Sequence, residues 1–130
     1  MSEPVFTNLA KIWVDEHDIT HVLFSQRREF TADDVDKYTK ICMETSKGKP
    51  SLVLLDFSNI NFLEMGAYKK LMSPELTRIT KASAVVVSPS SNFVVAGISF
   101  IMSLNKEPYP VKVFTNEAEA MEWLLSLKKK

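Results

Sequence analysis

Carboxylate and hydroxyl side chains that could carry chemistry follow one apolar segment of the chain. The segment VLLDFSNINFLEMGA, residues 53–67, reads as a strand that ends at Asp56, followed by Ser58 and then by Glu64 in a short loop before a helix. Ligands of open α/β sheets bind at the carboxyl ends of the strands, where such a loop lies. The candidate binding residues of this loop are Asp56, Ser58, Glu64, Met65, Gly66 and Tyr68.

Two histidines accompany a run of acids. His17 lies within the polar turn DEHD, residues 15–18, and His21 follows it on a strand-like segment. Imidazole and carboxylate groups could bind a divalent ion, but such a site needs three or four converging ligands. Because most of these side chains belong to one polar turn, we interpret them as solvated turn residues and predict no metal site.

The common catalytic motifs do not occur in the sequence. Cys42 falls on the apolar side of a predicted helix, which favours a core thiol over a nucleophile. There is no G-x-S-x-G motif, and three glycines are too few for a glycine-rich phosphate loop. We therefore expect no catalytic residues and no cofactor, and a protein that is not an enzyme.

Composition indicates one folded domain of 130 residues. Sixteen basic residues balance sixteen acidic ones, with no basic stripe, so we expect no nucleic-acid partner. The single cysteine excludes an internal disulfide, and the start of the chain does not resemble a secretion signal, which together predict a cytoplasmic protein. Residues 82–104 carry no charge, but SPSSN at 88–92 would place polar groups at the bilayer centre, so we predict no transmembrane segment.

The elements that must position the loop can be read from apolar patterning. A hairpin is predicted over 8–24, a helix from Thr31 to Gly48, and apolar strands over 51–57, 82–88 and 109–114. The remaining helices are predicted over 62–80, restarting at Ser73 and Pro74, over 93–104 and over 116–130. The order β-β-α-β-α-β-α-β-α predicts a single α/β domain with a mixed, mostly parallel five-stranded sheet, an N-terminal hairpin and about four helices.

The stretch from 53 to 67 resembles the central segment of the STAS domain, the SpoIIAA-like family that includes bacterial anti-sigma-factor antagonists. In that family an apolar strand ends in Asp-x-Ser, and a loop leads to an acid and two hydroxyl residues, one of which a partner kinase phosphorylates. Asp56 and Ser58 match the strand end, and Glu64 matches the acid. Met65 and Gly66 occupy the hydroxyl positions, so the resemblance implies a regulatory module that lacks the phosphoacceptor.

The tail NKEPYPVKVFTNEAEAMEWL, residues 105–124, extends the resemblance over nearly the whole chain. It is similar to small uncharacterised bacterial proteins described as STAS/SEC14-like. This resemblance implies a fold and leaves the activity open, because STAS relatives bind proteins or sometimes nucleotides, whereas SEC14-like relatives hold lipids in an apolar pocket.

The predicted helix 93–104 is apolar on all sides, and such a helix is covered on both faces. The cover could be the chain itself, a second subunit, an apolar ligand or a membrane surface. A homodimer is favoured, since large apolar patches usually mark interfaces. The candidate residues for an interface or an apolar ligand are Val95, Ala96, Ser99, Phe100, Met102 and Ser103. The sequence thus predicts a non-enzymatic protein-interaction or regulatory module, with a SEC14-like carrier of a small apolar molecule as the alternative.

Overall fold

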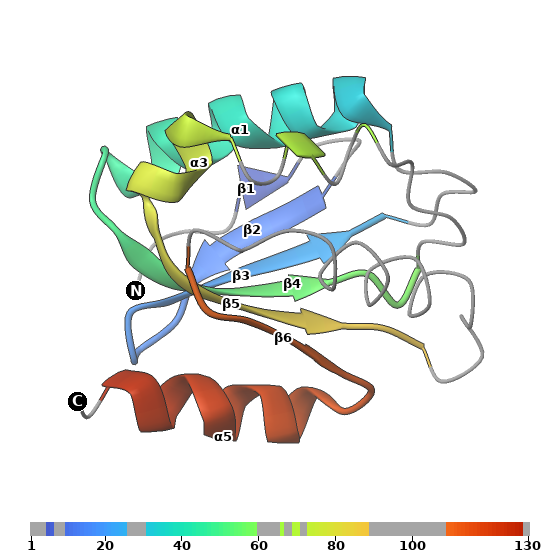
Figure 1. Ribbon diagram of the computed structural model, residues 1–130, viewed down its shortest axis with the longest axis vertical. Coiled ribbons are helices and arrows are strands. Elements are labelled where there is room, and N and C mark those ends of the chain that lie inside the picture. The colour runs from blue at the N-terminus through green and yellow to red at the C-terminus, as the bar shows by residue number, and fades with distance from the viewer. Residues whose placement is uncertain are drawn as a thin grey trace.

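A computed structural model describes residues 5–6, 10–25, 31–59, 66, 69–70, 73–88 and 109–128. Six strands and three helices lie within these residues (Figure 1). In chain order they are β1 (Val5–Phe6), β2 (Ala10–Val14), β3 (Ile19–Phe24), α1 (Ala32–Ser46), β4 (Ser51–Asp56), α3 (Pro74–Arg78), β5 (Thr80–Val86), β6 (Val111–Phe114) and α5 (Glu117–Lys128).

The strands form one mixed sheet in the order β1-β2-β3-β4-β5-β6. The β1/β2 and β2/β3 pairs are antiparallel, and the β3/β4, β4/β5 and β5/β6 pairs are parallel. The predicted α/β fold, with its N-terminal hairpin and mostly parallel sheet, is confirmed. The two-residue strand β1 joins the sheet as a sixth strand. It was not predicted, because two residues are too short to show any periodicity.

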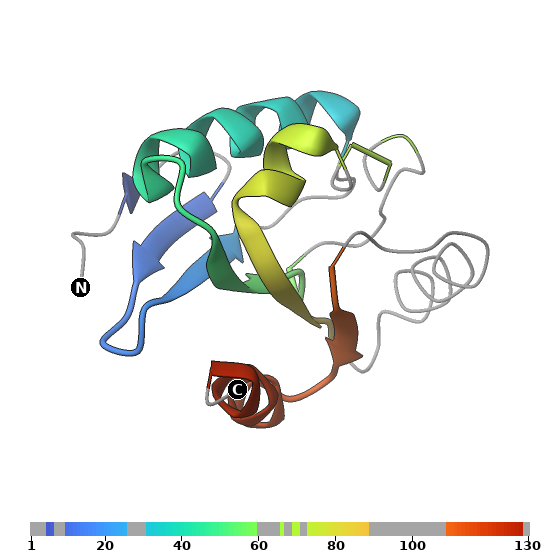
Figure 2. The same cartoon turned by 60° about the vertical axis from the view of Figure 1, so that its left-hand side comes forward.

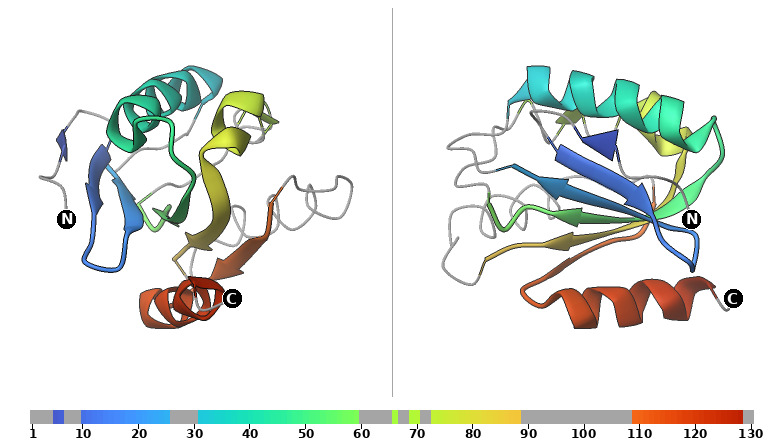
Figure 3. Two further views of the ribbon diagram at one scale, coloured as in Figure 1. Left: turned by 90° about the vertical axis from the view of Figure 1, so that its left-hand side faces the viewer. Right: turned by 180° about the vertical axis from the view of Figure 1, so that it is seen from behind.

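The sheet lies between two helical layers (Figure 2). Helices α1 and α3 cover one face and α5 covers the other, which the side views in Figure 3 also show. The α1 side buries a cluster that includes Phe24, Tyr38 and Phe57, and the α5 side buries a second cluster around Leu54 and Leu124. Both faces of β4 and β5 are therefore apolar, which explains their unbroken apolar runs. None of the described helices is long and apolar enough to cross a membrane.

Local sequence signals place the helix ends. The hydroxyl of Thr31 accepts a hydrogen bond from the backbone N–H of Asp34 at 3.3 Å, and the Asp34 carboxylate accepts one from the Thr31 N–H at 2.9 Å. This reciprocal capping box starts α1, as Thr31 predicted. The helix ends at Ser46; its C-cap residue Lys47 has φ of 55°, and Gly48 follows with φ of 80°. Glycine adopts that left-handed conformation without steric cost.

The register between β4 and β5 shifts by one residue where the two strands begin. Ser51 pairs with Thr80, but Leu52 pairs with Ala82, so Lys81 has no partner of its own on β4. Thr80 donates its hydroxyl to the Leu76 carbonyl on the α3 side, whereas Ala82 belongs to the cluster on the α5 side. Residues two apart on a regular strand lie on the same face of the sheet, whereas Thr80 and Ala82 lie on opposite faces. The irregularity at Lys81 therefore interrupts the alternation of side chains between the two faces.

Candidate functional site

The loop that follows β4 is held in shape by its own side chains. Asp56 Oδ1 accepts hydrogen bonds from the Ser58 backbone N–H at 2.9 Å and from the Ser58 hydroxyl at 2.5 Å. Such a turn, closed by an aspartate two residues back, is a common way to fix a tight bend. Asn59 Nδ2 donates to the Phe24 carbonyl at 3.1 Å and so joins the loop to the end of β3. Ser58 and Asn59 are exposed.

Phe57 anchors this loop in the core between its two polar neighbours. The residue is 1% exposed, and its ring stacks on Phe24 with a centroid distance of 4.8 Å and an interplanar angle of 4°. Its backbone N–H donates to the Val86 carbonyl of β5 at 2.8 Å. A buried aromatic ring thus positions an exposed Asp-x-Ser turn at the carboxyl end of a central strand, where the sequence placed it.

Other predicted site residues fall partly or wholly outside the described residues. Gly66 is described and half-buried, at a helical position. The described residues do not include three further loop candidates, Glu64, Met65 and Tyr68. They also do not include the predicted helix 93–104 with Val95, Ala96, Ser99, Phe100, Met102 and Ser103. For these residues the interface and apolar-ligand assignments remain predictions.

The interpretation of both histidines as solvated turn residues is wrong for His21. His17 is exposed, but His21 is only 7% exposed, and its Nε2 lies 2.7 Å from Asp15 Oδ2. The His21 ring also stacks on Trp13 at a centroid distance of 4.8 Å. The sequence could not show this burial, because the aromatic cover comes from the neighbouring strand, where Trp13 and His21 are cross-strand partners.

Asp15 organises the hairpin turn by accepting several hydrogen bonds. Burial raises the pKa of Asp15, but the hydrogen bonds from His21 and from the backbone N–H groups of Ile19 and His17 outweigh it and lower the pKa overall. In the described part of the chain, no three His, Cys, Asp or Glu side chains are close enough to share a metal ion. The contact of 2.7 Å between His21 Nε2 and Asp15 Oδ2 joins β3 to the hairpin turn.

The thiol of Cys42 is buried in α1, as the sequence predicted. Burial raises its pKa to about 12, although a hydrogen bond with Tyr38 lowers it slightly. A nucleophilic cysteine needs a thiolate at neutral pH, and that requires a lowered pKa. Cys42 therefore acts as a core residue.

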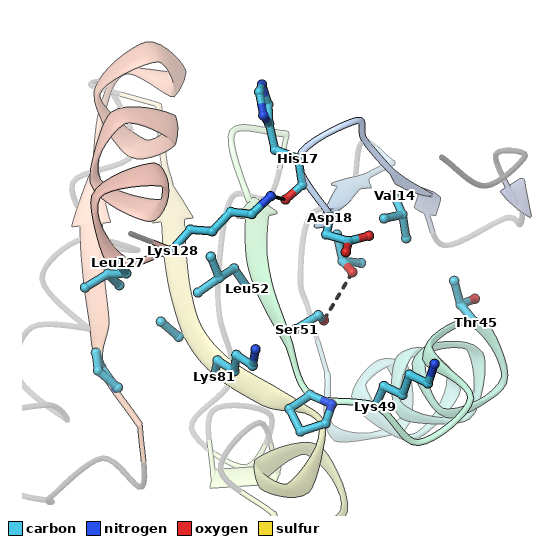
Figure 4. Close-up of a pocket in the computed structure, with 14 residues that line it drawn as sticks. Val14, His17, Asp18, Thr45, Lys49, Ser51, Leu52, Lys81, Leu127 and Lys128 are labelled. Carbon is cyan, nitrogen blue, oxygen red and sulfur yellow. Dashed lines mark hydrogen bonds between the residues drawn. The ribbon is translucent and has the colours of Figure 1, made fainter. Parts of the chain in front are cut away.

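A groove with a volume of about 600 Å³ lies at the opposite end of the sheet, by the amino ends of β4 and β5 (Figure 4). Its rim carries three lysines from separate elements: Lys49 before β4, Lys81 on β5 and Lys128 at the end of α5. The Lys128 ammonium donates to the His17 carbonyl at 2.5 Å, which joins α5 to the hairpin turn. Asp18 is the acidic residue among the described lining residues.

Sequence reasoning missed this groove. The three lysines are far apart in the sequence, and Lys128 alone belongs to a basic run, KKK at 128–130, so no local pattern connected them. One signal was available: the amino ends of parallel strands meet at one edge of a sheet, and Lys49 and Lys81 flank the starts of two predicted strands. The strand order needed to use that signal is known only from the structure.

Comparisons with known proteins place the chain among proteins without an assigned activity. A family model described as a domain of unknown function (DUF7793) matches residues 12–128. Among curated proteins, none matches this chain. A solved structure of an uncharacterised protein of the DUF3478 family from Shewanella loihica PV-4, described as having a SpoIIAA-like fold, is similar with a TM-score of 0.57 and 17% sequence identity. That alignment covers 95% of this chain and 98% of the other. The SpoIIAA-like fold implied by the resemblance is thereby confirmed.

Proposed function

Because the chain belongs to the DUF7793 family, whose description names no activity, we propose its function from the geometry of the site. It is a non-enzymatic protein-interaction or regulatory module that binds its partner through the loop after β4. The observation that carries this proposal is the exposed turn of Asp56, Ser58 and Asn59, closed by its own hydrogen bonds and anchored by Phe57.

A surface loop held in one conformation loses little conformational entropy when a partner binds it. Asp56 and Asn59 take part in the hydrogen bonds that hold this loop, which follows β4, a strand paired in parallel with β3 and β5. Recognition residues commonly occupy loops positioned in this way. The geometry therefore supports binding through the exposed side chains of the loop.

The titratable groups described above support a role without catalysis. Asp56 Oδ1 accepts both hydrogen bonds from Ser58, so it shapes the turn. His21 is paired with Asp15 beneath the hairpin, and Cys42 is buried with a pKa raised to about 12. Catalysis by a nucleophile and base needs these groups side by side and accessible. Each of them instead has a local structural partner, and the three groups lie on different elements: Asp56 at the end of β4, His21 on β3 and Cys42 on α1.

Partner capture with a matched pair of variants tests the proposal. Ser58→Arg places a bulky charge on the loop, and Ser126→Arg makes the same change at another exposed serine, on α5. We expect a protein that co-purifies with the wild type and with Ser126→Arg, and that is lost with Ser58→Arg. If every co-purifying protein is retained by Ser58→Arg, or is lost equally with both variants, the loop is not the interaction surface.

Native mass spectrometry of the purified chain tests the predicted homodimer. Phe100→Asp adds a charge to the apolar helix predicted over 93–104. We expect a dimer for the wild type and a monomer for the variant, because an unpaired charge in an apolar interface is costly. A wild-type monomer that carries an additional small mass would contradict the dimer and favour a carrier of a small apolar molecule.

A further inference from the structure

We propose that the groove at the amino ends of β4 and β5 binds a small phosphate ester with an apolar body. This site is separate from the loop after β4. The six residues of β4 put its two ends about 16 Å apart, from a rise of roughly 3.3 Å per residue. Binding in the groove is therefore independent of the function proposed for the loop.

The charges around the groove favour an anion. Lys49, Lys81 and Lys128 line it together with one acid, Asp18. The C-terminal turns of α1 and α5 also line it, and each helix end contributes roughly half a negative charge. Three full positive charges exceed the sum of these negative ones. Within the described part of the chain, neither Lys49 nor Lys81 forms an ion pair that would neutralise it.

The position of Lys81 is not explained by stabilisation of a helix end. Lysines near a helix C-terminus often do no more than offset its dipole, and this reading fits Lys128 at the end of α5. Lys81 instead lies on β5 at the shift in register, where the alternation of the strand is broken. In Figure 4 its side chain extends along the opening toward Ser51. Irregularities of this kind re-aim side chains next to functional sites.

The other side chains that line the groove are apolar or carry hydroxyl groups, and they suit the organic part of the ligand. Apolar side chains, among them Val14, Leu52 and Leu127, form part of the wall. The hydroxyls of Thr20 and Ser51 lie 3.2 Å apart and also line the groove, where they can donate to or accept from a ligand oxygen. The volume is within the range of about 300–1,000 Å³ that is usual for small-molecule sites.

Phosphate suits these cations better than carboxylate does. Arginine provides the planar fork that pairs with a carboxylate, and no arginine is among the described lining residues. Lysines act as separate point charges, and several of them can surround the oxygens of one phosphate group. The apolar wall then contacts the organic part of the ester.

Titration of the full chain with phenyl phosphate, followed by calorimetry and by NMR of the backbone amides, tests the assignment. Inorganic phosphate and phenol serve as the charged and apolar halves of the probe. We expect saturable binding of one phenyl phosphate, tighter than either half, with the largest amide shifts near Ser51 and Lys81. Lys81→Gln and Lys49→Gln should each weaken binding about three- to tenfold, as expected for loss of one hydrogen bond at a solvated site. Lys37→Gln, at an exposed position of α1, should leave it unchanged.

Each other result contradicts the proposal. No saturable binding of phenyl phosphate excludes the site. If inorganic phosphate binds as tightly as phenyl phosphate, the apolar wall does not contribute to binding. If phenol binds as tightly as phenyl phosphate, the lysines do not contribute. Equal weakening by Lys37→Gln shows a general effect of charge instead of a site. If Lys81→Gln does not fold, Lys49→Gln decides the outcome, because Lys49 lies in a loop outside the sheet.

Discussion

Replacing Phe57 by leucine should separate the anchoring of the loop from the chemistry of its exposed side chains. Phe57 is almost fully buried, and it lies between Asp56 and Ser58 in the sequence. Phe57→Leu keeps an apolar side chain at the position but removes the ring that stacks on Phe24. The exposed hydrogen-bonding groups of the loop are untouched by this change.

The expected loss of stability follows from two contributions. A conservative apolar exchange in a packed core costs up to about 1.5 kcal/mol. Loss of a stacked aromatic pair adds about 0.5–1.5 kcal/mol. We expect a total of about 2 kcal/mol in the free energy of unfolding, which for a domain of this size lowers Tm by roughly 6–10 °C. The Ser58 amide, which donates to Asp56, should also exchange faster with deuterated solvent.

Thermal unfolding and hydrogen exchange measure these two effects. Met43→Leu is the matched control, because Met43 lies on α1 with 36% of its surface exposed and a conservative change there should cost less than about 0.5 kcal/mol. If Phe57→Leu changes Tm no more than Met43→Leu does, the ring is not an anchor. A large fall in Tm without faster exchange at Ser58 would show that the ring stabilises the core but does not hold the loop.

Three further predictions concern other parts of the fold. The pKa of Asp15 is lowered on folding, so its contribution to stability is present above the ordinary value of 3.8 and is lost as pH falls through the lower folded value. In an acid titration, Asp15→Asn should therefore lose less stability than the wild type as pH falls below 3.8. Cys42 should react with a thiol reagent at mildly alkaline pH many times more slowly in the folded protein than in urea, because it is buried with a pKa raised to about 12. Thr31→Ala should lower the free energy of unfolding by about 1 kcal/mol in urea titration, through loss of the N-cap of α1.

A different result would contradict each of these three predictions. An identical acid profile for Asp15→Asn would show that the carboxylate does not stabilise the hairpin. Rapid labelling of Cys42 in the folded protein would mean that α1 opens readily or that the thiol is accessible. A Thr31→Ala variant as stable as the wild type would show that the remaining contacts of α1 suffice without its cap.

Patterns within a few residues account for the parts of the fold that were predicted. The unbroken apolar runs that became β4 and β5 marked strands covered on both faces. The capping residue Thr31 set the start of α1, and the polar turn after Val14 set the hairpin. The strand that ends at Asp56 placed the candidate loop at the carboxyl end of the sheet, where Ser58 is exposed.

Contacts between distant residues decided the rest. His21 is buried because Trp13 lies opposite it on the neighbouring strand, and a turn rich in acids cannot reveal that partner. The lysine-lined groove brings Lys49, Lys81 and Lys128 to one opening only after the order of the strands and a one-residue shift in register are settled. By itself the sequence determined the elements and the loop, since hydrophobic periodicity and capping act over a few residues. Only the tertiary structure decided which side chains meet, because that depends on how the elements pack.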